Sequence, residues 1–293
     1  MRISTLQQAR PRIMAEFDRR GNQVYSREDL ERILAERRDR WRLAVRITTS
    51  AFCAFLTTHG ELRHIRLEGN NKEEPVDRWS WGETSPLAIA SSLGGEGAYH
   101  SHASAMYVHG VTKRKPAAFY INREQSVKPR GKAGLSQDRI DMAFSRPQRM
   151  SNNVLSWAGF RFVFLSGKHT DNYAVEAFEG PQGEPVQCTG LERTLVDIAV
   201  RPSYAGGLEE VQAAYRSALE RVSINKLVTA LRKIGHVYPY HQAIGFYLER
   251  AGCAATPLAP LRRMGIKLNF YLAYDMEEKV LDPTWRVYHP PGF

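Results

Sequence analysis

Residues 26–60 read SREDLERILAERRDRWRLAVRITTSAFCAFLTTHG, and this stretch decides the expected fold of the front of the chain. Ser26, followed three residues later by Asp29, is a sequence signature of a helix start. The i, i+3, i+4 apolar spacing of a helix with one buried face then occurs twice. It is found at Leu30, Ile33 and Leu34, and again at Phe52, Phe55 and Leu56. The stretch therefore predicts two helices separated by a turn.

The sequence on either side of these helices completes a recognisable unit. An amphipathic helix is expected before them, over Leu6–Arg19. Two strands are expected after them, from Leu62 to Leu67 and from Val76 to Trp81, with a turn at residues 69–72. Three helices and a basic two-stranded ribbon are the parts of a winged helix-turn-helix, whose third helix enters the major groove of DNA. We therefore predict such a DNA-binding domain over residues 1–82.

Arginine dominates the basic residues of this unit. Five arginines lie between the cores of the second and third expected helices, at Arg37, Arg38, Arg40, Arg42 and Arg46. The planar arginine fork can hold a phosphate or a guanine edge with two hydrogen bonds. Asp39 is the last acid before Glu61, so the arginines after it lack a nearby carboxylate in the sequence. Earlier arginines are expected to pair with acids on solvated helix faces. These are Arg19, Arg20, Arg32 and Arg37, with Glu16, Glu28, Glu31 and Glu36 as partners.

The expected DNA contacts fall into three groups. Arg40, Arg42, Arg46, Thr48 and Thr49 surround the start of the recognition helix, and Arg63, Arg66, Lys72 and Arg78 line the wing. Basic loops farther along are expected to extend this surface over neighbouring phosphates, through Lys113, Arg114, Lys115, Lys128, Arg130 and Lys132.

The distribution of charge agrees with a front half that faces nucleic acid. The chain of 293 residues has a formal charge of +10 and a pI of about 9.6. Lys and Arg exceed Asp and Glu by four over residues 1–80, by five over 81–150 and by one over 151–293. A polyanionic partner is therefore expected, and double-stranded DNA is the predicted one.

Residues 83–293 are expected to form a second, mixed α/β domain, which makes the whole chain α+β. A helix should begin at Ser85-Pro86, and strands are expected around residues 117–121, 160–165, 173–178 and 185–188. Helices over 191–200, 208–222, 225–234 and 240–251 then give a helical C-terminal half. No run approaches the ~18 apolar residues of a membrane span, and the N-terminus lacks a signal-peptide core. The three cysteines are far apart, as in reduced thiols, so a cytoplasmic protein is expected.

No pattern for catalysis, metal binding or a cofactor is complete. His100, His102 and His109 have no Cys, Asp or Glu among them, so hydrogen bonding in the core is expected rather than metal ligation. The segment 166–170, SGKHT, follows a strand and has the composition of an anion cradle, but it lacks the spacing of a phosphate loop. We therefore expect a protein that is not an enzyme. Two alternatives stay open: a nucleic-acid-processing enzyme that uses Glu176, and a transcriptional regulator that responds to a small ligand.

Three segments carry a resemblance to a known family. They are residues 101–112, SHASAMYVHGVT, the region 147–176 with Arg149, Ser151 and the turn 167–170, and residues 191–215, LERTLVDIAVRPSYAGGLEEVQAAY. In this order they resemble the AbiEi-type antitoxins of bacterial type IV toxin–antitoxin and phage-defence systems. The resemblance implies an autorepressor that binds inverted repeats in its own promoter. It also implies a second domain that counteracts a nucleotidyltransferase-like toxin.

The segment 191–215 also has a purely structural interpretation. Its apolar spacing predicts a helix that stops at Arg201-Pro202, and Gly206-Gly207 allows a tight turn before the next helix. If the segment takes part directly in toxin control, Arg201 and Tyr204 are the residues expected to act. The sequence leaves both interpretations open.

Overall fold

The computed structural model describes residues 5–21, 23–70, 74–127 and 134–293. Its first part contains three helices and three strands, which are α1 (Thr5–Arg20), β1 (Val24–Tyr25), α2 (Arg27–Trp41), α3 (Thr49–His59), β2 (Leu62–Gly69) and β3 (Val76–Trp81). The expected start of α2 is confirmed. The Ser26 side chain accepts a hydrogen bond from the Asp29 amide, and the Asp29 carboxylate accepts one from the Ser26 amide.

The expected end of α2 was wrong. The helix continues to Trp41, so Arg37, Arg38 and Arg40 lie on it rather than in the turn that follows. Trp41 is only 2% exposed and stacks on Phe52 of α3, with ring centroids 5.7 Å apart. Burial of this large ring stabilises the last turn of α2, because packing of an apolar face supplies most helical stability in proteins.

The three helices surround a compact core that is closed by the β2–β3 ribbon. Phe17 of α1 stacks on Trp81 of β3 with centroids 4.8 Å apart, and the Trp81 indole donates a hydrogen bond to Asp18. All the buried members of this core lie between Ala9 and Trp81. β1 pairs antiparallel with β3 and so adds a short third strand to the ribbon.

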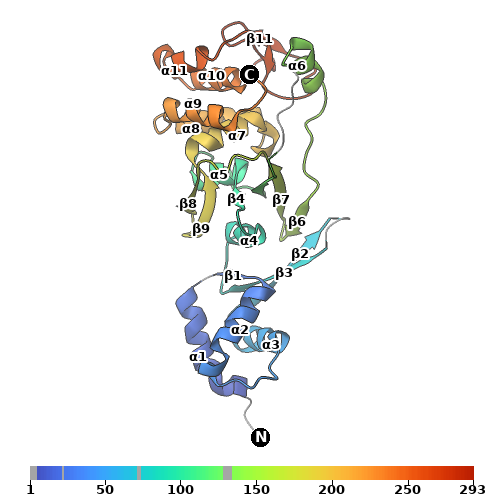
Figure 1. The fold of residues 1–293 in the computed structure, drawn as a ribbon, viewed down its shortest axis with the longest axis vertical. Helices are drawn as coiled ribbons and strands as arrows, with labels where there is room; N and C mark the ends of the chain where they lie inside the picture. The colour runs from blue at the N-terminus through green and yellow to red at the C-terminus, as the bar shows by residue number, and fades with distance from the viewer. Residues whose placement is uncertain (1–4, 22, 71–73, 128–133) are drawn as a thin grey trace.

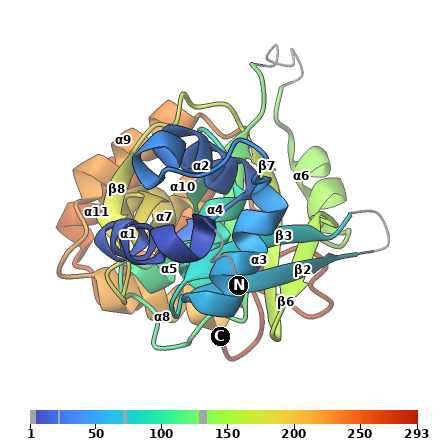
Figure 2. The same cartoon turned by 90° about the horizontal axis from the view of Figure 1, so that it is seen from below.

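The ribbon is part of a larger, curled sheet. The added strands are β4 (Tyr99–His100), β5 (Ala118–Glu124), β6 (Val154–Trp157), β7 (Phe160–Gly167), β8 (Val175–Glu179) and β9 (Pro185–Thr189). Over the described residues the strand order is β1-β3-β2-β6-β7-β5-β4-β9-β8. The end of β2 pairs with β6 at Glu68↔Ser156 and Gly69↔Leu155. Figure 2 shows the ribbon extending beside β6.

A second core lies between this sheet and two helices, α4 (Pro86–Leu93) and α5 (His102–Val108). The Ser85 hydroxyl accepts a hydrogen bond from the Ala88 amide, which confirms the expected helix start at Ser85-Pro86. Ile65 and Leu67 of β2 belong to this core together with Phe119 of β5 and Phe162 of β7. The ribbon therefore contributes apolar side chains to two cores.

The remaining α-helices of the described residues follow β5 in the chain. They are α6 (Gln137–Phe144), α7 (Leu191–Val200), α8 (Leu208–Ala218), α9 (Ile224–Ile234), α10 (Tyr240–Arg250) and α11 (Ala255–Arg262). A small sheet of β10 (Phe270–Tyr271), β12 (Val287–His289) and β11 (Val280–Asp282) packs at the end farthest from α1 (Figure 1). Gly245 of α10 faces the buried Trp285 ring, where a Cβ would lie 2.2 Å from the nearest ring carbon. The chain is thus a mixed α+β protein, as expected.

Among the described helices, none combines the length and the apolar character that crossing a lipid bilayer requires.

Candidate functional site

The first surface of interest is the outer face of α3. The helix buries Phe52, Cys53 and Leu56 and turns small side chains outward. The exposed residues are Ser50, Ala51, Ala54, Thr57, Thr58 and, in the last turn, His59. Because none of those before His59 is large, this part of the helix backbone can approach a groove closely. This face was not predicted, although the alternation of bulky and small residues in TSAFCAFLTTH indicates it.

The loop between α2 and α3 is held by one arginine. The Arg38 guanidinium donates hydrogen bonds to the carbonyl oxygens of Ala44 (2.7 Å), Val45 (3.3 Å) and Ile47 (3.0 Å). The loop begins at Arg42, which has a left-handed backbone with φ of 53° and caps α2 through its amide. Arg38 thus has a structural role in this loop.

Of the residues expected at the start of the recognition helix, Thr48 and Thr49 lie at the N-terminus of α3. Thr48 is its N-cap, with a side chain that accepts a hydrogen bond from the Ala51 amide (3.2 Å), and Thr49 is its first residue. Arg42 and Arg46 precede the helix rather than lying on it. Both are exposed, and so is Arg40 in the last turn of α2. Among the described residues, none of these three guanidinium groups forms an ion pair.

The earlier arginines are arranged differently from the expectation. Arg19, Arg20 and Arg37 all converge on Glu16, with N–O distances of 2.8, 3.0 and 3.1 Å. The Glu16 side chain is only 7% exposed, so this is a partly buried cluster and not a set of separate surface pairs. Burial alone would raise the pKa of the Glu16 carboxyl, but the hydrogen bonds and charges of the arginines outweigh it, and the net pKa is lowered.

The ribbon residues divide into two kinds. Arg63 and Arg66 are exposed on β2, beside the carboxylates of Glu83 (3.3 Å) and Glu68 (3.2 Å). Arg78 was expected on the same surface, but it is half-buried. Its guanidinium donates to the carbonyl oxygens of Asp77 (2.9 Å) and Ser92 (3.2 Å), which ties β3 to α4. Lys72 lies outside the described residues.

The first basic loop does not extend the α3 surface. Lys113, Arg114 and Lys115 are exposed, but they follow Thr112, whose hydroxyl donates to Glu210 of α8 at 3.3 Å. α8 lies in the upper half of the molecule in Figure 1, whereas α3 lies in the lower half. The expected continuous basic surface is therefore interrupted. Lys128, Arg130 and Lys132 lie outside the described residues.

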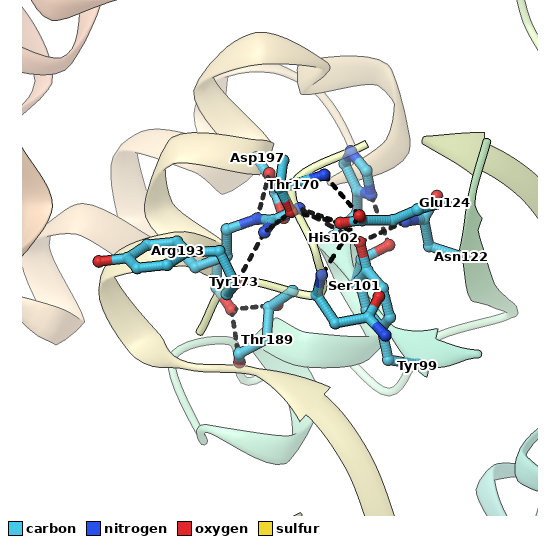
Figure 3. A network of polar contacts seen from close by, with 12 residues as sticks. Tyr99, Ser101, His102, Asn122, Glu124, Thr170, Tyr173, Thr189, Arg193 and Asp197 are labelled. Carbon is cyan, nitrogen blue, oxygen red and sulfur yellow. Dashed lines mark hydrogen bonds and ion pairs between the residues drawn. The ribbon is translucent and has the colours of Figure 1, made fainter. Parts of the chain in front are cut away.

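A second polar region is built around Arg193 of α7, whose side chain is 5% exposed. Its guanidinium contacts Asp197 at 3.3 Å and Glu124 of β5 at 3.7 Å. It also donates to the hydroxyl of Tyr99 (3.2 Å) and to the carbonyl oxygen of Tyr173 (2.7 Å). Figure 3 shows these groups meeting from separate elements. The network holds α7 against the sheet.

A cavity of about 930 Å³ opens beside this network. Residues from all three segments of the sequence resemblance line it, namely His102, Arg149, Ser151, Lys168, Arg201 and Tyr204. The sequence separation of these segments gave no indication that they meet at one place.

Arg201 and Tyr204, the expected toxin-control residues, are both in the cavity wall. The half-buried Arg201 donates to the Arg149 carbonyl oxygen at 3.4 Å. Tyr204 is 6% exposed, and its hydroxyl accepts a hydrogen bond from the Ser151 amide at 2.9 Å. The Tyr204 ring packs edge-on against His102, with centroids 5.3 Å apart. The helix, stop and turn expected around them are present in α7 and α8.

The three histidines singled out in the sequence have separate partners. His100 contacts the Ser91 hydroxyl (2.8 Å), His102 the Ser101 hydroxyl (2.9 Å) and His109 the Thr189 carbonyl oxygen (2.6 Å). Burial lowers the pKa of His100 to about 4 and that of His102 to about 3. Within the described ranges, no group of three His, Cys, Asp or Glu side chains has the arrangement of a metal site.

The similarity to known proteins concerns the fold alone. No family model matches the chain, and no curated protein matches it. The structure is similar to the crystal structure of the RV2827C protein from Mycobacterium tuberculosis, with a TM-score of 0.60 and 18% sequence identity. The match covers 96% of this chain and 91% of that chain.

Proposed function

We propose that this protein is a DNA-binding transcriptional regulator in which the first three helices and the ribbon act as a winged helix domain. The observation that carries the proposal is the surface of α3. Its exposed residues before the terminal His59 all have small side chains, and exposed Arg40, Arg42 and Arg46 lie in the end of α2 and the loop that lead into it. Small residues favour entry into a groove, and unpaired arginines favour contact with phosphates or guanine edges.

The backbone at Arg42 adds support. For an L-residue other than glycine, a left-handed backbone conformation costs about 1–2 kcal/mol. Such conformations persist where the surroundings impose them, and they are frequent at functional sites. Here the Arg42 amide is held by the carbonyl oxygens of Arg38 and Asp39 at the end of α2. This conformation ends α2 at the exposed Arg42, at the start of the loop that leads to α3.

The test is a fluorescence anisotropy titration on the DNA upstream of the gene, with scrambled DNA as control, at two salt concentrations. Wild type should bind the upstream DNA selectively and with strong salt dependence. The double variant Arg42→Ala and Arg46→Ala should bind at least tenfold more weakly, and its log–log salt slope should fall by about 2 if both contact phosphates.

The matched control for this test is the double variant Arg216→Ala and Arg232→Ala. It removes the same charge from exposed positions on α8 and α9. Equal affinity and equal salt slope for both double variants would rule out α3 and its loop as the DNA-reading surface.

We further propose, from the sequence resemblance, that the regulator represses its own operon and acts as the antitoxin of a nucleotidyltransferase-like toxin. The three resembling segments line one cavity, which supports a common role for them. Co-expression should relieve growth arrest caused by such a toxin encoded beside the gene. The Arg42 and Arg46 double variant should relieve it equally, since this activity does not depend on the α3 surface. Absence of rescue by wild type would remove the antitoxin part of the proposal.

A further inference from the structure

We propose that the cavity beside α7 binds a nucleotide, with Arg149, Lys168 and Arg201 around its phosphates and tyrosine rings against its base. This proposal does not rest on DNA binding or on antitoxin activity. The cavity volume of about 930 Å³ lies within the range of about 300–1,000 Å³ that is usual for small-molecule sites. An inorganic anion alone would leave most of this volume unfilled.

The charges that line the cavity are mainly positive. Four cationic side chains line it, those of Arg149, Lys168, Arg193 and Arg201, and Asp197 is the only carboxylate among the described lining residues. Asp197 and Glu124 both contact Arg193, so their charges offset that arginine. With Glu124 counted, the four cations exceed the two carboxylates by two, which favours an anionic ligand.

Neutral groups hold two of these cations in place. The Lys168 ammonium donates to the carbonyl oxygens of Ile234 (2.6 Å) and Gly235 (2.5 Å) at the end of α9. Arg201 donates to the Arg149 carbonyl oxygen. These hydrogen bonds fix the positions of the two charged groups. A site preorganised in this way loses little conformational freedom when an anion binds.

His236 supplies a second, independent observation at the cavity wall. Its Nε2 atom is buried and has no hydrogen-bond partner among the described residues, and the residue lines the cavity. Buried polar atoms are nearly always hydrogen-bonded, so an orphaned one at a cavity wall needs an explanation. Burial first, and then the charges of Lys168, Arg193 and Arg201, lower the pKa of His236 to about 3. The direction of the charge effect agrees with a positive potential inside the cavity.

Aromatic rings complete the chemistry of the site. Tyr238 and Tyr274 line the cavity with partly exposed side chains. A base has two π-faces, and stacking on an aromatic ring is a general and sequence-tolerant way to hold it. A cavity lined by both cationic groups and tyrosines fits a phosphorylated nucleoside better than a free phosphate or a neutral metabolite.

The test is isothermal titration calorimetry of the full chain with ATP, GTP, CTP and UTP. Tripolyphosphate and the four nucleosides serve as probes of each half of the ligand. At least one nucleotide should bind more tightly than tripolyphosphate and more tightly than its own nucleoside. Arg201→Gln and, separately, Arg149→Gln should each weaken that binding by about tenfold or more, as expected for loss of a charge-assisted hydrogen bond.

Arg216→Gln is the matched control, because it removes one exposed arginine from α8 and should leave nucleotide affinity unchanged. Thermal melts of all variants show whether each is folded, and nucleotide should raise the melting temperature of wild type. Three results would overturn the proposal. They are no binding of any nucleotide at millimolar concentration, equal binding of tripolyphosphate and nucleotides, or unchanged affinity in both folded cavity variants.

Discussion

Glu16 shows how one carboxylate organises several arginines in the N-terminal core. It accepts hydrogen bonds from Arg19 and Arg20 on its own helix and from Arg37 on α2, so it joins two helices. Replacing it by Gln would leave three guanidinium groups around a neutral, partly buried side chain. Removing one partner of a buried ion pair costs about 3–5 kcal/mol. Because the arginines here are partly exposed, we expect Glu16→Gln to lower the free energy of unfolding by about 2–3 kcal/mol.

The same carboxylate makes stability depend on pH. Its folded pKa is lowered from the ordinary value of 4.5, so its contribution is fully present above that value. The contribution is lost as the pH falls through the lowered folded pKa. Chemical denaturation at pH 7, 5 and 3 should therefore show a difference between wild type and Glu16→Gln that shrinks toward pH 3. Glu31→Gln, at an exposed position on α2, is the control and should differ little from wild type at any of these values. A difference independent of pH would contradict the assignment.

At the scale of elements, the position of α3 depends on the α2–α3 loop and therefore on Arg38. A lysine at this position would keep the charge but could not reach three carbonyl oxygens with a planar fork. We expect Arg38→Lys to lower stability by about 1–2 kcal/mol and to weaken binding of the upstream DNA several-fold, because Arg42 and Arg46 lose their fixed positions. Arg32→Lys, on the same helix, should bind as wild type does. DNA affinity unchanged by Arg38→Lys would show that the loop needs no such support.

Local signals predicted many elements well and failed where burial depends on distant contacts. The capping residues Ser26 and Ser85 marked the starts of α2 and α4, and α7 occupies the expected residues 191–200. Sequence analysis missed α6, whose Phe144 packs on Tyr274 with ring centroids 4.3 Å apart. It also missed β6, a four-residue strand that pairs with β2 far away in the sequence. Short elements of this kind carry too little periodicity to be seen without their partners.

Local sequence signals also failed to predict side-chain positions that depend on distant contacts. Composition and spacing indicated that Arg42 and Arg46 lie near the start of a helix, because both belong to one short segment. They could not show that Arg78 turns inward to the Ser92 carbonyl oxygen, which depends on where α4 packs. The cavity was invisible for the same reason. Residues such as His102, Lys168 and His236 become neighbours only through the fold of the whole chain.

At the scale of the whole molecule, β2 links the proposed DNA-binding part to the rest. Among the described residues, Leu62–Leu67 pair with β3 and the last two residues of β2 pair with β6, so one sheet runs through both parts (Figure 1). Asn70, at the end of this strand, also donates a side-chain hydrogen bond to the Asn152 carbonyl oxygen. Asn152 lines the cavity beside α7. A direct contact therefore connects the ribbon with the cavity wall.

This continuity predicts how the N-terminal part behaves alone. Ile65 and Leu67 are 3% and 0% exposed in the full chain. There they pack with side chains of β5, β6 and β7, which we call the central sheet. A fragment of residues 1–82 would expose both, and burial of each is worth about 1.5–3 kcal/mol. We therefore expect the fragment to fold around its own core, which extends from Ala9 to Trp81, but to bind a hydrophobic dye such as anilinonaphthalene sulfonate. The full chain should bind little of it.

The fragment with Ile65→Thr and Leu67→Thr is the matched control and should bind much less dye while keeping its helical circular dichroism. Equal dye binding by the two fragments would mean that the exposed apolar surface lies elsewhere. A fragment that binds no dye and melts as sharply as the full chain would show that the ribbon does not need the central sheet.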